Sequence, residues 1–257
     1  MEPRAGDRVI LAGQEPDLVI DRVAPRRTEL VRPAVANVDL AVIVMAVADP
    51  PPNLLLLDRL VVLAEAAGLD VAVCANKVDL AGEESWRWWV DVYRALGYPV
   101  LPTSGVRGDG VAELRRLLQG RISTFCGPSG VGKSALLNAV QPGLQRVTGE
   151  VSPRLRRGRH TTRHVELLPL EGGGLVADTP GFSALSVHHI PSQELGHYFR
   201  EIHATAPGCR FAGCLHRTEP ACAVREAAAE GRIAPFRYRN YLALLAEVLD
   251  YEAHRYD

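Results

Sequence analysis

The sequence predicts an α/β fold: a doubly wound, mostly parallel sheet, with a short β segment before it and a helical region after it. Three observations favour this fold. Strand-like and helix-like apolar patterns alternate through residues 34–188, as expected when helices cover both faces of a parallel sheet. Residues 1–33 instead contain short β-like stretches separated by Gly and Pro, and the pattern after about Pro191 is helical. We therefore expect three domains, 1–33, 34–188 and 189–257.

Each element is predicted from an apolar run of strand or helix length, with glycine closing two of the helices. In the first domain, strands are expected at 8–11, 18–23 and 28–31. In the second, the expected elements are strand 40–46, helix 54–67, strand 71–75, helix 84–96, strand 99–101, helix 111–118, strand 122–126, a helix from Lys133, and strands 164–169 and 175–177. A last helix is expected over 235–251. Because three short strands rarely fold alone, we expect the first domain to be the end of a small β-barrel without its earlier strands.

Composition excludes several classes of protein. A formal net charge of −1 argues against a protein that coats nucleic acid non-specifically, although it leaves room for a local basic patch. The longest apolar run, 40–48, is far shorter than the roughly 20 residues of a membrane span, and the N-terminus has no signal-peptide pattern. We expect a cytoplasmic monomer without a membrane partner. Five cysteines in that compartment suggest metal binding or packing rather than disulfides.

A phosphate-binding loop is the strongest motif. Residues 127–134 read G-P-S-G-V-G-K-S, which matches G-x-x-x-x-G-K-[ST] in full, between a predicted strand and a predicted helix. In such a loop Lys133 reaches the β- and γ-phosphates, as a binding and catalytic residue, and Ser134 ligates Mg²⁺. The candidate nucleotide-binding residues here are Gly127, Pro128, Ser129, Gly130, Val131, Gly132, Lys133 and Ser134.

The segment Asp178-Thr-Pro-Gly181 follows the predicted strand 175–177. An Asp at the end of such a strand can hold the Mg²⁺ shell, and the N–H of Gly181 can sense the γ-phosphate. A plain Pro-Gly turn explains these four residues equally well when they are taken alone. The phosphate-binding loop favours the functional interpretation.

A guanine-reading motif is expected at Asn76-Lys77-Val-Asp79, directly after a predicted strand. The Asp79 carboxylate can accept two hydrogen bonds from guanine, which adenine does not offer, so an ATPase is disfavoured. Asn76 is expected to brace the loop and the Lys77 stem to cover the base. Four residues are a weak signal alone. Thr103 and Ser104, at the end of the next strand, strengthen it because a small residue there can back the base with its main-chain N–H.

These motifs are in an unusual order. In familiar G proteins the phosphate-binding loop comes first, whereas here residues 76–79 and 103–104 precede 127–134. A doubly wound sheet that is cut at one surface loop and rejoined at another keeps the same site. The sequence therefore predicts a circularly permuted P-loop GTPase domain, which uses GTP and GDP. In this order the Asp178 segment leads directly into the C-terminal region.

A switch segment is expected at 152–163, where Thr161 or Thr162 is the candidate for ligating Mg²⁺ and closing over the γ-phosphate. Five arginines crowd it, so it is either a solvated basic loop or a surface that faces RNA or phosphate. Phe182 occupies the position where many G proteins have a water-orienting Gln. His160 is the candidate replacement, with a structural or RNA-facing role as the alternative.

Cys209, Cys214, His216 and Cys222 supply three thiolates and one imidazole within fourteen positions. This donor set suits one closed tetrahedral Zn²⁺ site that would staple a segment too short to hold a core of its own. Cys74 and Cys126 lie on predicted core strands and are expected to be packing residues.

Taken together, the segments 32–39, 76–79, 127–134, 158–162 and 178–182 and the Cys/His cluster resemble the ribosome small-subunit-dependent GTPase A family of bacterial circularly permuted GTPases. The resemblance implies an N-terminal OB-fold barrel, the permuted GTPase domain and a C-terminal zinc domain. It also implies late maturation of the small ribosomal subunit, contact with its rRNA, and GTP hydrolysis stimulated by that subunit. A GTP-binding switch or scaffold with negligible turnover is the alternative, suggested by Phe182 and the short β segment.

Overall fold

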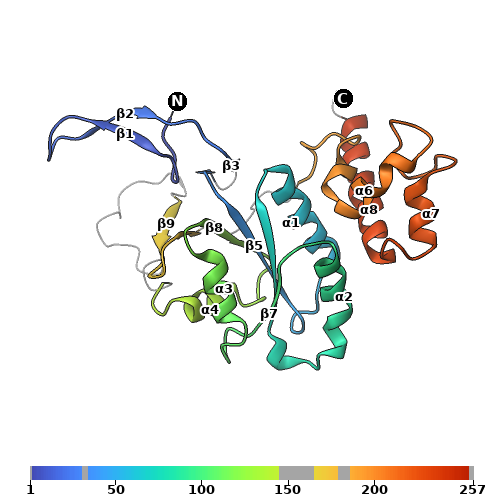
Figure 1. Ribbon diagram of the computed structural model, residues 1–257, viewed down its shortest axis with the longest axis horizontal. Helices are drawn as coiled ribbons and strands as arrows, with labels where there is room; N and C mark the ends of the chain where they lie inside the picture. The colour runs from blue at the N-terminus through green and yellow to red at the C-terminus, as the bar shows by residue number, and fades with distance from the viewer. Residues whose placement is uncertain (1, 31–33, 145–164, 179–185, 255–257) are drawn as a thin grey trace.

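The computed structural model describes residues 2–30, 34–144, 165–178 and 186–254 (Figure 1). At its centre these residues form a six-stranded sheet in the order β7-β6-β5-β8-β10-β9. The strands are β5 (Leu40–Ala46), β6 (Asp70–Asn76), β7 (Val100–Thr103), β8 (Ile122–Cys126), β9 (Glu166–Pro169) and β10 (Leu175–Asp178). Every neighbouring pair is parallel except β9 and β10. The predicted α/β fold with a mostly parallel sheet is confirmed.

Helices cover both faces of the sheet, and the alternation of β5 side chains shows why. Ala41, Ile43 and Met45 join one apolar cluster with α1 (Leu54–Ala66) and α2 (Glu84–Ala95). The intervening residues of β5 join a second cluster with α3 (Val111–Leu118) and α4 (Lys133–Val140). Because β5 is buried on both faces, it is apolar along its whole length. Cys74 and Cys126 are fully buried in these two clusters, as expected of packing residues.

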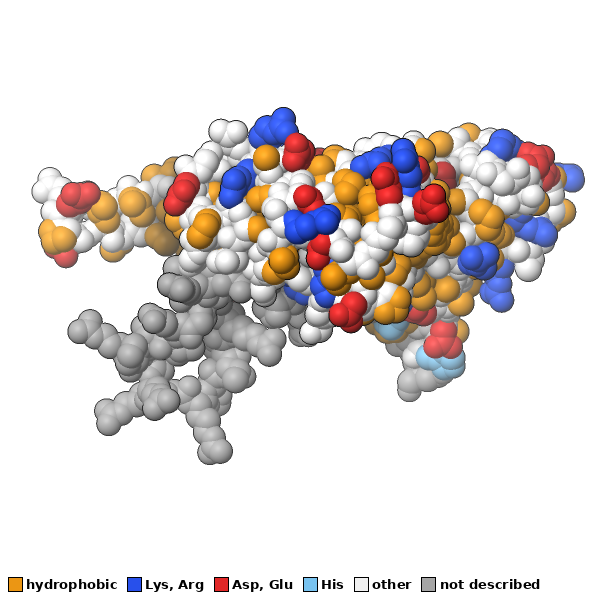
Figure 2. Space-filling view, turned by 90° about the horizontal axis from the view of Figure 1, so that it is seen from below, with side chains coloured by type: hydrophobic (Ala, Val, Ile, Leu, Met, Phe, Trp, Pro, Cys, Tyr) orange, Lys and Arg blue, Asp and Glu red, His pale blue; other side chains and the backbone are white. Residues whose placement is uncertain are grey.

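The N-terminal segment contains two short antiparallel pairs. β1 (Val9–Ala12) and β2 (Val19–Val23) form a hairpin, and β3 (Glu29–Leu30) pairs with β4 (Val35–Ala36). β4 was not predicted, because two residues are too few to show an alternating pattern. The hairpin projects away from the sheet (Figures 1 and 2). Its large apolar side chains are exposed; they are Val9, Ile10, Leu11, Leu18, Val19 and Ile20.

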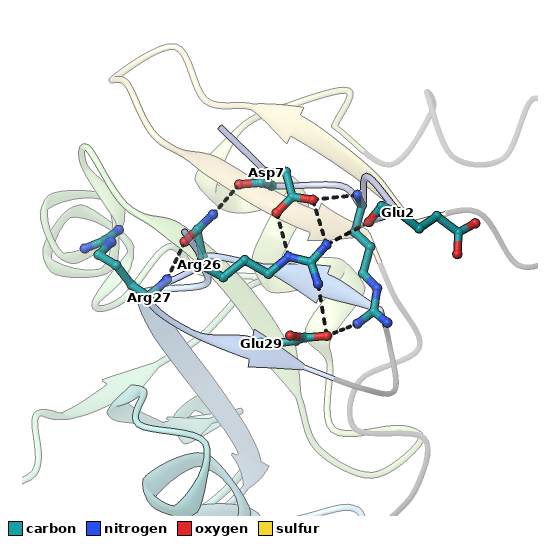
Figure 3. Close-up of polar contacts among 8 residues, drawn as sticks. Glu2, Asp7, Arg26, Arg27 and Glu29 are labelled. Carbon is teal, nitrogen blue, oxygen red and sulfur yellow. Dashed lines mark hydrogen bonds and ion pairs between the residues drawn. The ribbon is translucent and has the colours of Figure 1, made fainter. Parts of the chain in front are cut away.

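Polar contacts hold this segment together (Figure 3). The Arg26 guanidinium donates to both carboxylate oxygens of Asp7, at 2.8 and 2.9 Å, and lies 3.1 Å from Glu29. The hydrogen bond from Arg26 holds the pKa of Asp7 below its ordinary value. The neighbouring Arg27 donates to Asp39, at 2.7 Å, just before β5 begins. The N-terminal segment is thereby tied to the first strand of the central sheet.

The C-terminal region is helical and packs against α1 on the side away from the hairpin (Figure 1). Its elements are η3 (Leu195–Tyr198), α6 (Arg200–Thr205), η4 (Ala206–Gly208), α7 (Ala223–Ala229) and α8 (Pro235–Ala253). Val62 and Leu63 of α1 belong to the same apolar cluster as Leu244 and Val248 of α8. No helix in the described part of the chain is both long enough and apolar enough to cross a membrane.

Candidate nucleotide and metal sites

The predicted nucleotide residues come together because parallel strands end at one edge of the sheet. β5, β6, β7, β8 and β10 all point the same way, so the loops after them leave from that edge. In open α/β sheets, ligands bind outside the carboxyl ends of the strands. The phosphate-loop residues, the 76–79 segment and the 103–104 pair therefore share one region, although up to 58 positions separate them in the sequence (76 to 134).

Glycine is required at two positions of the phosphate-binding loop. Gly127 follows β8 with φ +141°, and a Cβ there would lie 2.1 Å from the carbonyl oxygen of Val44. Gly132 caps α4 with φ +90°, and a Cβ there would lie 2.5 Å from Nδ2 of Asn76. Both backbones adopt the conformation that favours glycine, and both approach another segment too closely for a side chain. The loop geometry thus fits a phosphate cradle at a helix N-terminus.

Lys133 begins α4 and turns back into the loop. Its Nζ donates to the carbonyl oxygens of Gly127 and Pro128, both at 2.8 Å. Burial lowers the pKa of Lys133. An ammonium that is partly removed from water is favoured by a nearby anion, so the loop presents a cation where phosphate oxygens would lie. Ser129, Gly130 and Ser134 are exposed beside it.

Asn76, the last residue of β6, joins that strand to the phosphate-binding loop. Its Nδ2 donates to the carbonyl oxygen of Val131, at 2.8 Å, and its Oδ1 accepts from Oγ1 of Thr103, at 3.1 Å. Asn76 and Thr103 are 1% and 0% exposed, so neither bond competes with water. Three loops are therefore held in one arrangement by a single amide. Sequence reasoning placed Thr103 near the base, whereas in the structure its hydroxyl orients Asn76.

The loop after β5 lies beside the same site. Lys77 has φ +66°, and its Nζ donates to the carbonyl oxygen of Asp49. A Cβ at Gly130 would lie 3.7 Å from Cδ of Pro50, so this loop also flanks the phosphate cradle. The sequence of this loop, Asp-Pro-Pro-Pro, matches no nucleotide motif, so its place beside the site was not predicted.

Asp79 is half-buried in η1 (Val78–Leu80). A hydrogen bond from the Ser104 side chain is the main reason why the pKa of Asp79 lies below its ordinary value. The carboxylate is thereby kept in the ionised form that can accept two hydrogen bonds from a base. The main-chain N–H of Ser104 donates to Asp109, at 3.0 Å, so it is the Ser104 side chain that faces Asp79.

Several predicted residues lie outside the described part of the chain. They are His160, Thr161, Thr162, Gly181, Phe182 and the arginines of 152–163. Asp178 is the last residue of β10, next to β8, which places its backbone at the edge where the phosphate-binding loop begins.

The four predicted metal ligands converge in the C-terminal region. One donor atom from each of Cys209, Cys214, His216 and Cys222 lies within 4.8 Å of the others. Nδ1 of His216 is 3.5 Å from Sγ of both Cys209 and Cys222, and those two sulfurs are 3.8 Å apart. Burial raises the pKa of the Cys214 thiol to about 12. Three soft sulfurs and one imidazole nitrogen at this spacing fit a closed tetrahedral Zn²⁺ site, in which the ion stabilises thiolates.

Three residues that sequence reasoning missed support the backbone of this cluster. Tyr238 and Tyr241 of α8 donate to the carbonyl oxygens of His216 and Leu215, at 2.7 and 2.8 Å. Glu219 accepts backbone N–H bonds from Leu215, Arg217 and Thr218, at 2.7 to 2.9 Å. Burial acts to raise the pKa of Glu219, but these N–H groups prevail and hold it at about 2. In the sequence Glu219 is only an acidic residue two positions after Arg217, and nothing there marks it as a support for the cluster.

Comparison with known proteins agrees with this geometry. A model of the RsgA GTPase family matches residues 23–188. A protein of Caldanaerobacter subterraneus subsp. tengcongensis, named "Small ribosomal subunit biogenesis GTPase RsgA", is 48% identical over 256 residues, which are 99% of this chain and 86% of that protein. The crystal structure of YjeQ from Thermotoga maritima has a TM-score of 0.84 at 39% identity, covering 97% of this chain and 85% of that one. That of YloQ, a circularly permuted GTPase, has a TM-score of 0.83 at 36% identity, covering 97% and 82%.

The likeness extends over nearly the whole chain, 99% of it for the Caldanaerobacter protein and 97% for each of the two crystal structures. The predicted permutation is confirmed, because the segment 76–79 and the pair 103–104 precede the phosphate-binding loop in a fold shared with a permuted GTPase. The chain therefore belongs to the RsgA GTPase family, and it is a GTP hydrolase with a circularly permuted nucleotide domain.

Proposed function

We propose that this GTPase acts on the small ribosomal subunit late in its maturation, that it contacts the subunit's rRNA as a cytoplasmic monomer, and that the subunit stimulates hydrolysis. The observation that carries the proposal is that Asn76 joins the segment 76–79 to the phosphate-binding loop. The chain in which this occurs is 48% identical to a protein named for small ribosomal subunit biogenesis. The five arginines of 152–163 supply charge for contact with RNA phosphates.

The residues divide the chemistry in the following way. Asp79 selects guanine, and the Lys77 stem covers the base. The loop from Gly127 to Gly132 binds phosphate oxygens, with Lys133 compensating their charge. Ser134, Asp178 and Thr161 or Thr162 would hold Mg²⁺, which neutralises negative charge on the phosphates. The Gly181 N–H would sense the γ-phosphate. His160 orients the attacking water when the protein is bound to the subunit, since Phe182 offers no hydrogen-bonding group.

Zinc completes the proposed cofactor set. One Zn²⁺ held by Cys209, Cys214, His216 and Cys222 would staple the C-terminal region, and all four ligands are protein atoms, which leaves no position open for chemistry. A switch or scaffold with negligible turnover is the competing function. It is favoured by Phe182, and the turnover experiment below separates the two.

The first prediction concerns the Asn76 bridge. Asn76→Ala removes both buried hydrogen bonds and leaves the Val131 carbonyl without its donor, at a cost of about 1–3 kcal/mol. We expect GDP affinity to fall about tenfold or more, since each 1.4 kcal/mol is tenfold. Titration with a fluorescent GDP analogue measures this. Thr103→Val, which removes only the second bond, should have a smaller effect. Equal affinity in the Asn76→Ala variant and the parent contradicts the bridging role.

The second prediction concerns base selection. Asp79→Asn replaces a double acceptor with an amide that complements the 2-oxo group of xanthine. We expect nucleotide preference to shift from GTP toward xanthosine triphosphate, measured by competition binding. The matched control is Asp109→Asn, because Asp109 is exposed and paired with Arg107 near the same loops. If the Asp79→Asn variant keeps the parent's preference for GTP, this residue does not read the base.

The third prediction concerns the metal. We expect one Zn²⁺ per purified chain, with a lower content in Cys214→Ser and further loss in strong chelators, because a closed site depends on every ligand. Elemental analysis per mole of protein gives the content. Cys74→Ala is the control, since Cys74 is buried in the sheet and remote from the cluster. Stoichiometric zinc after two ligands are removed refutes the assignment.

The fourth prediction concerns hydrolysis. With purified small subunits present, GTP turnover should rise, and His160→Ala should lose most of that rise while keeping GTP affinity nearly intact. Positioning of the nucleophile, rather than covalent chemistry, is what phosphoryl transfer needs from the protein. Lys133→Ala should instead weaken nucleotide binding. Phosphate release assays with and without subunits measure both. No stimulation in the parent protein supports the scaffold function, and an unchanged His160→Ala rate removes His160 from the mechanism.

A further inference from the structure

A buried charge network joins the nucleotide domain to the C-terminal region. Arg237 of α8 is 1% exposed. Its Nε and Nη2 bind both oxygens of Glu201 on α6, at 2.6 and 3.0 Å, and its Nη1 binds Asp58 of α1. The guanidinium also lies over the rings of Tyr93 and Phe199, with centroids 5.1 and 4.7 Å away. One cation is therefore shared between a carboxylate of its own region and a carboxylate of the nucleotide domain.

The contact between the nucleotide domain and the C-terminal region around Arg237 and Asp58 is called the joint below. Asp58 accepts hydrogen bonds from both sides of it. Tyr93 of α2 donates to one oxygen, and Asn240 of α8 donates to the other at 2.6 Å. Asp58 is fully buried, so a small tilt that parts it from Arg237 without admitting water would leave a charge unpaired. Removing one partner from a buried ion pair is strongly destabilising, because it leaves the other charge buried and uncompensated. A partial opening of the contact between the C-terminal region and α1 is therefore disfavoured.

Apolar contacts also cross between the nucleotide domain and the C-terminal region. Val62 and Leu63 of α1 lie in the cluster that forms the core of the C-terminal region, together with Leu195, Phe199 and Leu244. Because part of that core belongs to α1, the C-terminal region is incomplete without the nucleotide domain. Its helices α6 and α7 have only six and seven residues, which is too short for stability of their own.

Each side of the joint leads to a site. On α8, Tyr238 and Tyr241 are one and four positions after Arg237, and they donate to the backbone carbonyls of His216 and Leu215. On α1, the N-cap Asn53 is five residues before Asp58 and ends the loop that carries Pro50 beside Gly130. The network thus lies between the metal cluster and the phosphate-binding loop, with one helix spanning each distance.

We propose that Arg237 and Asp58 make the C-terminal region and the nucleotide domain one cooperative unit, so that nucleotide at the phosphate-binding loop protects the Cys/His cluster from losing its metal. Arg237 and Asp58 are positioning residues, since neither touches nucleotide or metal. The proposal rests on the proposed zinc site for its most direct measurement. The proposed coupling acts through these side-chain contacts, and not through the backbone that connects β10 to the C-terminal region.

The physical basis is linkage. A ligand that binds only the closed state reduces opening by a factor of about 1 + [L]/Kd, whatever part of the unit is observed. If the cluster loses metal only when the whole unit opens, GDP reduces that loss by the same factor. If the C-terminal region opens by itself, GDP bound to the other domain has no effect. Nucleotide-dependent metal release therefore reports whether the joint is cooperative.

The experiment follows zinc transfer from the full-length, zinc-loaded protein to a colorimetric chelator, with and without Mg²⁺ and GDP at about 100 times its Kd. We expect release to be slowed about 100-fold in the parent protein. Asp58→Asn keeps the shape of the side chain but removes its charge. Arg237 then remains paired with Glu201 inside its own region, and the region can open without leaving a charge unpaired. We expect GDP protection in this variant to be at least fivefold smaller than in the parent.

Arg232→Gln is the matched control, because it removes an exposed Arg–Glu pair in the same region and should keep full protection. Tyr93→Phe, which removes one donor to Asp58, replaces Asp58→Asn if that variant does not fold. The proposal is overturned if GDP slows zinc release from the parent protein less than threefold. It is also overturned if GDP protects the parent and the Asp58→Asn or Tyr93→Phe variant equally. If the purified protein contains no zinc, the zinc proposal fails separately, and hydrogen exchange of α8 amides with and without GDP decides the coupling.

Discussion

Strand β5 pairs with β6 over all seven of its residues and with β8 over four, and this double pairing positions the site. Its register sets Ala46 level with Asn76, but Ile43 level with Cys126, so β8 ends three residues earlier than β5 and β6 do. The phosphate-binding loop lies beside the end of β5 that β8 does not pair with. Gly127 touches Val44 there, and Val131 comes within hydrogen-bonding distance of Asn76. A different register would separate the two halves of the nucleotide site.

Local patterns predicted the elements that such pairing requires. The bounds of β5, α3 and β8 agree with the apolar runs 40–46, 111–118 and 122–126, because a strand buried on both faces or a helix with one apolar face leaves an unambiguous signal. The motif residues could be assigned to strand ends for the same reason. β4 escaped prediction because its two residues are defined only by pairing with β3.

Contacts between distant residues could not be predicted. Arg237 and Asp58 are 179 positions apart, and each alone resembles an ordinary charged residue on a helix. The same holds for Tyr238 and Tyr241. Their hydroxyls donate to backbone carbonyls of the Cys/His cluster from a helix that begins after that cluster in the sequence. Asn76 is intermediate: its motif predicted a bracing role, but only the fold identifies Val131 and Thr103 as its partners. Buried polar groups need specific partners, and a sequence does not state which ones they are.

The strand order has a consequence for how this chain is made. A polypeptide leaves its own ribosome from the N-terminus, so β5, β6 and β7 emerge before β8 and can pair in sequence. The second edge of β5 belongs to β8, which emerges only after residue 122, with β10 and β9 later still. In the unpermuted order, the phosphate-loop strand would already be present when the central strand emerged. Here the most apolar strand of the sheet has one open edge while some eighty residues are synthesised, and an open apolar edge is a template for unwanted pairing. The nascent chain of this GTPase thus passes through a stage at which one edge of its central strand has no partner, and the order of the strands along the chain sets the length of that stage.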